Sequence, residues 1–511
     1  MAATSEALGE PLPRGGELMI DWRGHAGSMG AALLVLILAS VNFLLNLGEP
    51  RAPIWDESYY LTATERYSEG IAQFASHPPL GLMLIAAGDA VLHPNDHLDT
   101  HDLGRVKSVS GESLPAGFSF AGVRLASGLF AVLAALAFYG LMLCLTESVL
   151  PALAFSNLFI FENAFITQFR AAHLDAFQVA FAVLALWCFT AAVKRGSGRS
   201  LPHELGLGAA CGLAMMVKLN GGVLLALCVL LVAWRVIGAG DARPRRQALV
   251  PSALALAVMG AGTLSVVLAV FTTHVLISGR AMDRQTAAGR ADTAFLSEDY
   301  AEYLQGKRPL SPSVLLSAGS DYRKFMLNDF THIALRDPNA SSPLGWPLEQ
   351  GTINYRWDSD GVRTAYVQLV GNLASWCLAL LALLAAPALL LLQWLRPVRS
   401  SDPTRRALMT LLFIQYVIFL AVHAYLGTQR VMYLYHYFIG LLICFTLLPL
   451  TLRELEDRFP GVRQREPAVL GAVTLVVLGS FIFYSPLSFH RPLAHSQCEA
   501  RNMLQHVVDC R

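Results

Sequence analysis

Two adjacent carboxylates, Asp56 and Glu57, follow the first long apolar segment, and the string His-Pro-Pro-Leu-Gly occupies positions 77–81. A carboxylate can act as a general base on an acceptor hydroxyl, and a second carboxylate beside it raises its proton affinity or holds the acceptor. The same pair also suits a helix start, because Asp is favoured at the N-cap and Glu in the first turn. We predict that this stretch is the catalytic centre of a membrane enzyme.

Three basic residues are candidates for binding an anionic substrate. Arg170 lies in a short polar link between two apolar segments, and Lys218 and Arg430 lie at segment ends. A guanidinium binds phosphate through two parallel hydrogen bonds. The alternative is that each side chain only reaches from a segment end to the membrane interface. Several cations and two acids on one face of a sparsely charged chain favour the functional interpretation.

Three more polar residues have a structural and a functional interpretation. Asp175 either caps the apolar segment that follows it or belongs to the site. His436 lies inside an apolar segment and is either a core histidine or a contact to a lipid phosphate. His77 could bind a metal, but it has no companion ligands at a useful spacing, so we predict no metal ligands. The two adjacent acids could hold a divalent ion, which the chemistry does not require.

The composition defines the elements that must position these residues. Of 511 residues, 54% are hydrophobic and 15% are charged, whereas about a quarter are charged in soluble domains. The apolar residues lie in runs of roughly 20, long enough to cross a bilayer. The chain is therefore predicted to be an all-α polytopic membrane protein. A net charge of +1 gives no indication of nucleic-acid binding.

We predict eleven transmembrane helices. The first 28 residues lack the apolar region of a cleavable signal, so the first helix is expected to serve as signal and anchor. A helix over about 79–92 is too short to span; it either lies in the interface plane or packs on the bundle. The predicted spans are 29–48, 119–145, 149–165, 174–193, 204–218, 221–238, 249–278, 366–395, 407–426, 431–450 and 468–486.

Basic loops orient these spans, because short loops rich in Lys and Arg stay cytoplasmic. With eleven spans, the clusters at 194–199, 243–246, 396–406 and 453–465 share one side with the N-terminal tail, 1–28. The predicted organisation is a transmembrane catalytic module at 29–278 and four further spans within 365–486. The first loop (49–118), the second loop (279–364) and the C-terminal tail (487–511) then face the other side.

The two tail cysteines, Cys498 and Cys510, would lie in an oxidising compartment in this orientation. Disulfides persist in such compartments. The residues form a disulfide in one interpretation and remain two unpaired thiols in the other. The other six cysteines fall in apolar runs and are expected to be small core or lipid-facing residues.

The motifs resemble those of the protein O-mannosyltransferase family, which belongs to the superfamily C glycosyltransferases. Asp56-Glu57 followed by the 77–81 string is the most specific element. Further similar strings are Arg170 with Asp175 five residues later, Lys218 after the fifth span, Trp346-Pro347, Gly371-Asn372 with Trp376, and Tyr435-His436-Tyr437. The resemblance covers most of the chain, and its eleven-span topology agrees with the predicted count.

The resemblance implies an inverting glycosyltransferase that moves a sugar, typically mannose, from a polyprenyl phosphate of the dolichyl type to a hydroxyl outside the cytoplasm. By this resemblance Asp56 is the general base and Glu57 assists acceptor placement. Arg170, with Lys218 or Arg430, would hold the donor phosphate. Asp175, His436, His77 and Trp346 are further expected substrate-binding residues. No cofactor is required, and the partners are the lipid donor, the acceptor and membrane lipids.

Two departures from the family pattern leave the acceptor open. The loop at 279–364 is too short for the β-trefoil domain of the eukaryotic enzymes. Asp337-Pro338-Asn339 stands where a His-Pro-Tyr string is familiar. The acceptor is then protein Ser or Thr, lipid A or another glycan, and the sugar is not fixed. The missing domain indicates a bacterial inner-membrane enzyme with its active site facing the periplasm.

Two other functions would also fit parts of the sequence. A transporter or flippase of a lipid-linked substrate would also need many spans and buried charges. Transporters of the common kind have repeated halves and broken helices near the midplane, and the sequence has no convincing internal repeat. A non-catalytic scaffold would leave Asp56 and Glu57 as a helix cap only.

Overall fold

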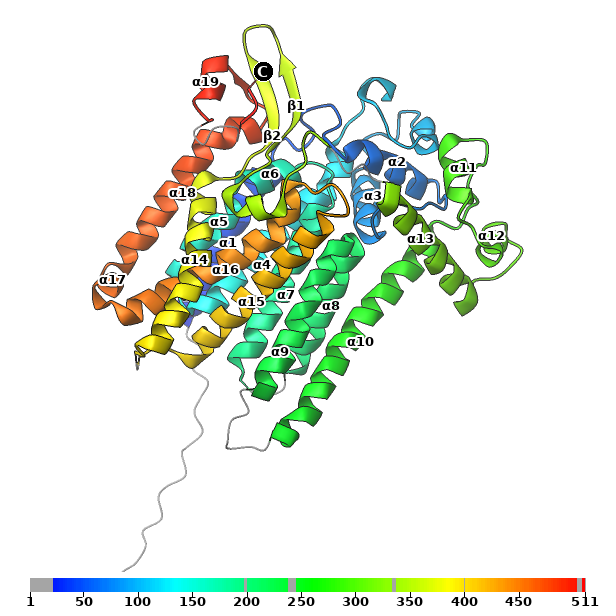
Figure 1. Ribbon diagram of the computed structural model, residues 1–511. Coiled ribbons are helices and arrows are strands. Elements are labelled where there is room, and N and C mark those ends of the chain that lie inside the picture. Colours follow the sequence, from blue (N-terminus) through cyan, green and yellow to red (C-terminus); the bar gives the residue numbers. More distant parts are fainter. Residues whose placement is uncertain are drawn as a thin grey trace, which may run out of the picture.

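The chain forms a bundle of long helices with shorter helices and a small sheet gathered at one end (Figure 1). The computed structural model describes residues 22–196, 200–237, 245–332, 337–398, 400–502 and 508–510. Most of the predicted tail 1–28 therefore lies outside the described residues. So do positions 197–199, 243–244 and 399 of the predicted basic clusters. The prediction of an all-α polytopic fold is confirmed.

By length and composition, nine described helices could cross a membrane, or ten if one bent pair counts as a single span. The bent pair is α5 (Val149–Ile160) with α6 (Asn163–Phe169). The nine are α1 (Trp22–Leu44), α4 (Ala121–Thr146), α7 (Asp175–Lys194), α9 (Leu225–Ile237) with the turn η3 (Leu219–Leu224), α10 (Arg245–Ile277), α14 (Leu373–Leu395), α15 (Pro403–Leu426), α16 (Phe438–Arg458) with the turn η5 (Leu434–Tyr437), and α18 (Glu466–Ser488).

The predicted count of eleven is thus close to the structure but does not match it. The predicted span 149–165 is bent by 57° between α5 and α6. Glu162 starts α6 there by accepting a hydrogen bond from the backbone N–H of Ala164 at 3.3 Å. The predicted span 204–218 is α8 (Leu201–Val217), whose 17 residues fall short of a full span. It ends because the backbone of Lys218 turns to an extended conformation.

The first loop contributes α2 (Glu57–Ser68) and α3 (Leu80–Leu92), followed by the short turns η1 (His101–Arg105) and η2 (Gly111–Ser113). Glycines let α3 approach the bundle closely. A β-carbon at Gly88 would lie 2.9 Å from the backbone nitrogen of Ala126 in α4, and one at Gly81 would lie 2.6 Å from Leu174. Of the two alternatives for this helix, packing on the bundle is therefore the one observed.

The second loop holds α11 (Ala287–Thr293), α12 (Glu298–Leu304), α13 (Pro312–His332), the turn η4 (Pro343–Leu348) and the antiparallel strands β1 (Ile353–Ser359) and β2 (Thr364–Leu369). A bulge between Asn354 and Arg356 shifts their register. Two contacts tie this loop to the first one. Arg66 forms a buried ion pair with Asp292 at 3.0 Å, and the backbone N–H of Ala72 donates to the carbonyl of Arg280 at 2.9 Å.

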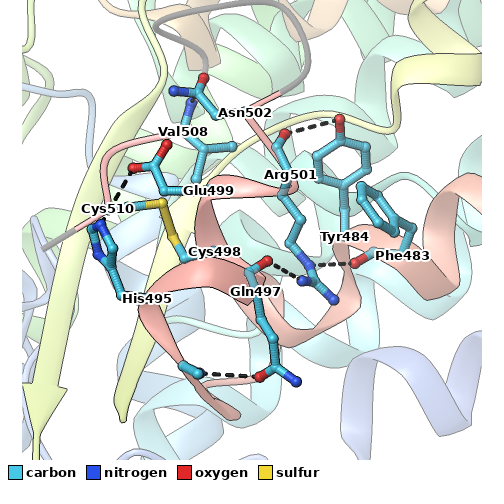
Figure 2. The surroundings of a disulfide bond; sticks show 11 residues. Phe483, Tyr484, His495, Gln497, Cys498, Glu499, Arg501, Asn502, Val508 and Cys510 are labelled. Carbon is cyan, nitrogen blue, oxygen red and sulfur yellow. Dashed lines mark hydrogen bonds and ion pairs between the residues drawn. A yellow bond between two sulfur atoms is a disulfide. The ribbon is translucent and has the colours of Figure 1, made fainter. Parts of the chain in front are cut away.

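The C-terminal tail adds the third strand of the sheet. Its short strand β3 (Pro492–Leu493) pairs with β2, and α17 (Pro460–Gln464) and α19 (His495–Glu499) flank α18. Cys498 and Cys510 form a disulfide with their α-carbons 5.8 Å apart, so the disulfide interpretation is confirmed (Figure 2). Arg501 donates from Nε to the carbonyl of Phe483 in α18 at 2.7 Å. In Figure 1 both loops and the tail lie at the same end of the bundle.

Candidate active site

Glu57 is fully buried, and every contact of its carboxylate is a strong one. Arg124 binds both oxygens, with Nε 2.7 Å from Oε1 and Nη2 2.8 Å from Oε2. The backbone N–H groups of Ala172 and Ile54 donate to the same two oxygens at 2.6 and 2.8 Å. Burial raises the pKa of Glu57, but Arg124 and these hydrogen bonds outweigh it and lower that pKa below its usual value. Glu57 is therefore an ionised anchor.

Arg124 is the residue at this site that the sequence interpretation missed. It lies in the first turn of the apolar helix α4 and is fully buried. Besides Glu57, it donates to the carbonyls of Pro50 and Ala52, each at 2.9 Å. Its guanidinium lies 4.5 Å from the ring centroid of Phe120. A single arginine inside an apolar span was the signal that could have found it, because such charges are expensive in a membrane.

Asp56 differs from its neighbour in having no partner. It precedes α2, yet its side chain makes no capping hydrogen bond. Within the part of the chain that the structure describes, its carboxylate makes no hydrogen bond or ion pair. The residue before it, Trp55, has a left-handed backbone with φ of 50°, which is uncommon for a bulky residue and is typical of functional sites. The helix-cap interpretation therefore does not account for Asp56.

The charges around Asp56 act on it from several elements. Burial raises the pKa of Asp56; His173, Lys218 and Arg430 oppose that rise, and Asp175 adds to it. The net effect is a raised pKa. A raised pKa makes a carboxylate a stronger base. Two adjacent carboxylates thus differ in character because only Glu57 has an arginine bound to it.

Lys218 and Asp175, which were both predicted, form a buried ion pair. Nζ of Lys218 lies 2.8 Å from each carboxylate oxygen of Asp175. Gln168 donates to Asp175 at 2.7 Å and accepts from the hydroxyl of Tyr355 at 2.6 Å. Nζ of Lys218 also lies 4.9 Å from the ring centroid of Tyr435. The hairpin strand β1 thereby reaches the same network as α7 and the end of α8.

Aromatic rings surround this charged group. The ring of Trp55 lies 5.2 Å from that of Tyr355 and 5.7 Å from that of Tyr433, measured between centroids. The ring of His436 stacks on Tyr435 at 4.6 Å. These rings bring β1 and η5 next to the start of α2. Aromatic faces of this kind suit contact with apolar sugar faces and exclude water.

Trp346 supports that aromatic group from the second loop. It is fully buried, and its indole N–H donates to the hydroxyl of Ser341 at 2.8 Å. Its ring is nearly parallel to that of His436, with centroids 6.3 Å apart. The structure therefore brings Trp346 and His436 together, as supporting residues beside Lys218 and Tyr435.

His77 and Arg430 lie around this group, and the guanidinium of Arg430 lies 5.4 Å from the ring centroid of Phe330 in α13. Burial lowers the pKa of His77 well below its usual value, and Lys218 and Arg430 lower it further. The imidazole is therefore neutral. The hydroxyl of Tyr322 in α13 donates to the backbone carbonyl of His77 at 2.8 Å, which fixes the turn before α3. Among the described residues there is no cluster of three His, Cys, Asp or Glu that could hold a metal ion.

Arg170 is placed differently from the other predicted cations. Its guanidinium donates to the carbonyls of Asn42 and Asn46, at the end of α1, at 3.0 and 3.2 Å. It lines a cavity of about 420 Å³ whose walls include Ile54 but not Asp56, Lys218 or Arg430. The structure does not bring Arg170 into the group around Asp56, and its predicted contact with the donor phosphate stays a prediction.

A helical membrane bundle with an unpartnered carboxylate, buried cations and aromatic rings at one end defines a membrane glycosyltransferase. Two family models match the chain: dolichyl-phosphate-mannose-protein mannosyltransferase over residues 33–273, and the C-terminal four-span region of protein O-mannosyltransferase over residues 321–507. The chain belongs to the protein O-mannosyltransferase family. The predictions of this family and of a glycosyltransferase are confirmed.

A solved structure shows the same fold over most of the chain. The chain of the protein O-mannosyltransferase Pmt1-Pmt2 complex from S. cerevisiae, bound to the sugar donor, superposes with a TM-score of 0.76 at 14% identity; 96% of this chain and 93% of that one are covered. An Archaeoglobus fulgidus oligosaccharyltransferase gives 0.48 at 13% identity (90% and 53% covered), and ArnT from Cupriavidus metallidurans gives 0.32 at 14% (83% and 77% covered). No curated protein sequence matches the chain.

Proposed function

We propose that this glycosyltransferase moves mannose from a polyprenyl-phosphate donor to a hydroxyl acceptor, with Asp56 as the general base. The observation that carries the assignment is the contrast between two neighbours. The Glu57 carboxylate already accepts hydrogen bonds from Arg124 and from two backbone N–H groups, whereas the Asp56 carboxylate makes no hydrogen bond in the described part of the chain. Only Asp56 can accept a proton without breaking an existing contact.

The proposed reaction is an in-line displacement. The acceptor hydroxyl gives its proton to the Asp56 carboxylate while its oxygen forms a bond to the anomeric carbon. The bond from that carbon to the phosphate oxygen breaks, and polyprenyl phosphate leaves with the electron pair. The anomeric configuration is inverted because attack and departure occur on opposite sides.

Lys218 and Arg430 are the proposed ligands of the donor phosphate. Cations stabilise the charge that develops on a leaving phosphate. Lys218 reaches it while keeping its contact with Asp175, which holds the ammonium at 2.8 Å from both carboxylate oxygens. His77 and His436 are proposed to line the donor site, with Trp346 behind His436.

Glu57 is proposed to position Asp56. Its bonds to Arg124 in α4 and to the N–H of Ala172, which precedes α7, fix the segment before α2 on both sides. This role explains why a second acid next to the base need not touch substrate.

The site is proposed to face the periplasm of a bacterial inner membrane. The basic clusters at the other end of the chain's spans support this orientation. The proposed acceptor is a protein Ser or Thr, as the matched family models describe, and a lipid or glycan hydroxyl is the alternative. Labelling of a cysteine introduced at the exposed Asp360 with a membrane-impermeant maleimide in intact cells tests the orientation.

The test of the base compares Asp56→Asn with the wild-type protein, using polyprenyl-phosphate mannose labelled in the sugar and a mixed pool of protein and lipid acceptors. We expect transfer to fall by about 100-fold or more, as on loss of a general base. Asp102→Asn is the matched control, because its side chain is 89% exposed at the same end of the molecule. Undiminished transfer by Asp56→Asn would remove Asp56 from the role of base.

A further inference from the structure

The cavity lined by Arg170 opens at the loop-bearing end of the bundle, between the last turns of α1 and α18. Its volume is about 420 Å³. The lining residues include Arg170, Asn42 and Asn46 on one side and Ser485, Phe489 and Arg491 on the other. Asp56, Lys218, Arg430, His77 and His436, which are proposed to act on the sugar donor and the acceptor, do not line it.

Two cations meet at this cavity around one aromatic ring. The guanidinium of Arg170 lies 5.0 Å from the ring centroid of Phe489, and that of Arg491 lies 5.7 Å from the same centroid. Arg170 is 9% exposed, and its guanidinium donates hydrogen bonds to two neutral carbonyl oxygens, those of Asn42 and Asn46. Neither arginine forms an ion pair with a carboxylate in the part of the chain that the structure describes.

The acids near the cavity are engaged elsewhere. Glu49, which lines it, pairs with the exposed Arg51 at 3.0 Å, and Asp358 pairs with His490 at 2.8 Å. A buried guanidinium without a counter-ion is energetically unfavourable, and a bound anion would relieve this. A guanidinium can bind a phosphate group through two hydrogen bonds, and both Arg170 and Arg491 line this cavity.

The same cavity is open to lipid. Val41 in the last turn of α1, Leu45 directly after it and Ile482 in α18 line it, and they are 51%, 60% and 59% exposed. Because α1 and α18 are long enough to span the membrane, acyl chains can lie against these apolar side chains while the polar end reaches the arginines. A soluble anion would gain nothing from this apolar rim.

We propose that this cavity binds the phosphate group of a membrane lipid, separately from the sugar donor site. Arg170 and Arg491 hold the phosphate, and the chains lie along Val41, Leu45 and Ile482. The inference does not depend on the proposed transfer reaction. Lipids with this chemistry are an anionic phospholipid or a free polyprenyl phosphate, and the test separates them.

Lipid binding is measured by native mass spectrometry of the purified full chain, titrated separately with phosphatidylglycerol, undecaprenyl phosphate and the zwitterionic phosphatidylcholine. We expect the wild-type protein to retain one of the first two lipids over phosphatidylcholine. Arg491→Gln, which alters an exposed side chain, should weaken that binding by about fivefold or more. Ser485→Phe should weaken it by filling the cavity without removing charge.

Arg363→Gln is the matched control, because Arg363 is an exposed arginine at the same end that does not line the cavity. It should bind like the wild-type protein, and so should Asp56→Asn, since the site is separate from the base. Arg170→Gln should abolish the preference for an anionic lipid over phosphatidylcholine. If that variant fails to fold, Arg491→Gln and Ser485→Phe test the proposal. The lipid whose binding these variants lose identifies the source of the phosphate. Equal binding of both anionic lipids by wild type, Arg491→Gln and Ser485→Phe would overturn the proposal.

Discussion

Arg124 binds Glu57 through both carboxylate oxygens, although 67 positions separate them in the chain. The pair is completely buried. This ion pair holds the segment that contains Asp56 against the first turn of α4. The position of the proposed base is thus determined by an ion pair in which the base takes no part.

Arg124→Gln should destabilise the protein strongly. The substitution leaves the buried Glu57 carboxylate without its counter-ion, which costs about 3–5 kcal/mol in comparable buried pairs. Thermal unfolding in detergent, followed by intrinsic fluorescence, measures the effect. Arg105→Gln, which breaks the exposed pair with Asp102, should cost no more than about 1 kcal/mol. The double variant Glu57→Gln/Arg124→Gln should recover part of the loss, and a double variant as unstable as Arg124→Gln would contradict this account.

Transfer should depend on pH through Asp56. Burial holds the pKa of this carboxyl above 3.8, its ordinary value, and only the ionised form accepts a proton. We expect kcat/KM to rise with pH and to reach half its plateau at a pH above 3.8. Lys218→Gln removes a cation that lowers this pKa, so the midpoint should move to higher pH in that variant. If the midpoint of the pH profile is the same in Lys218→Gln and in the wild-type protein, the rise of kcat/KM with pH is not due to Asp56.

Asp56→Asn should be more stable than the wild-type protein at neutral pH. A carboxyl whose pKa is higher in the folded protein than in the unfolded chain binds more protons when folded, so stability falls as pH rises through that interval. The amide removes this loss. The difference in Tm between Asp56→Asn and wild type should be positive at pH 7.5 and should shrink as pH falls below the unfolded value. A lower Tm of the variant at pH 7.5 would show that the carboxylate stabilises the fold.

Glu349, in the second loop, should also make the stability of the folded protein depend on pH. Its burial raises its pKa to about 7, while the backbone N–H of Gly371 lowers it less. By the same sign argument, its contribution to stability falls as pH rises from about 4.5 to above 7, by on the order of 3 kcal/mol in total. Glu349→Gln should flatten the Tm profile between pH 5 and 8. Glu499→Gln, at an exposed position of the tail, is the control and should leave the profile unchanged.

Loss of the disulfide should release the tail. Cys498 and Cys510 close a loop of 12 positions, for which a disulfide contributes about 2–4 kcal/mol to local stability. Cys498→Ser should therefore make the chain after α18 sensitive to limited proteolysis. Cys377→Ser, which changes a free cysteine in α14, should not. Equal cleavage rates in Cys498→Ser and wild type would mean that β3 and Arg501 suffice to hold the tail.

Sequence patterns predicted those features that depend on residues close together in the chain. The adjacent acids at 56–57, the histidine at 77 and the apolar runs predicted the family, the fold class and most of the group around Asp56. They could not predict that Arg124 reaches Glu57 or that Tyr355 reaches Gln168, because these contacts join positions 67 and 187 apart. Nothing in the local sequence pattern of Arg170 indicated that its guanidinium lies beside Phe489, because these residues are far apart in the chain. The predicted span count exceeds that of the described helices because Glu162 interrupts one apolar run and α8 ends early, at Val217.

The contacts of Glu57 also fix an order of events during synthesis. Its partners Arg124 and Ala172 are made 67 and 115 residues after it. In a nascent chain that ends after α3, the segment that contains Asp56 therefore lacks the contacts of Glu57 with Arg124 and Ala172. The segment acquires its arrangement only once α4 and the start of α7 have been made, so the proposed base has no fixed position in chains that end before α7.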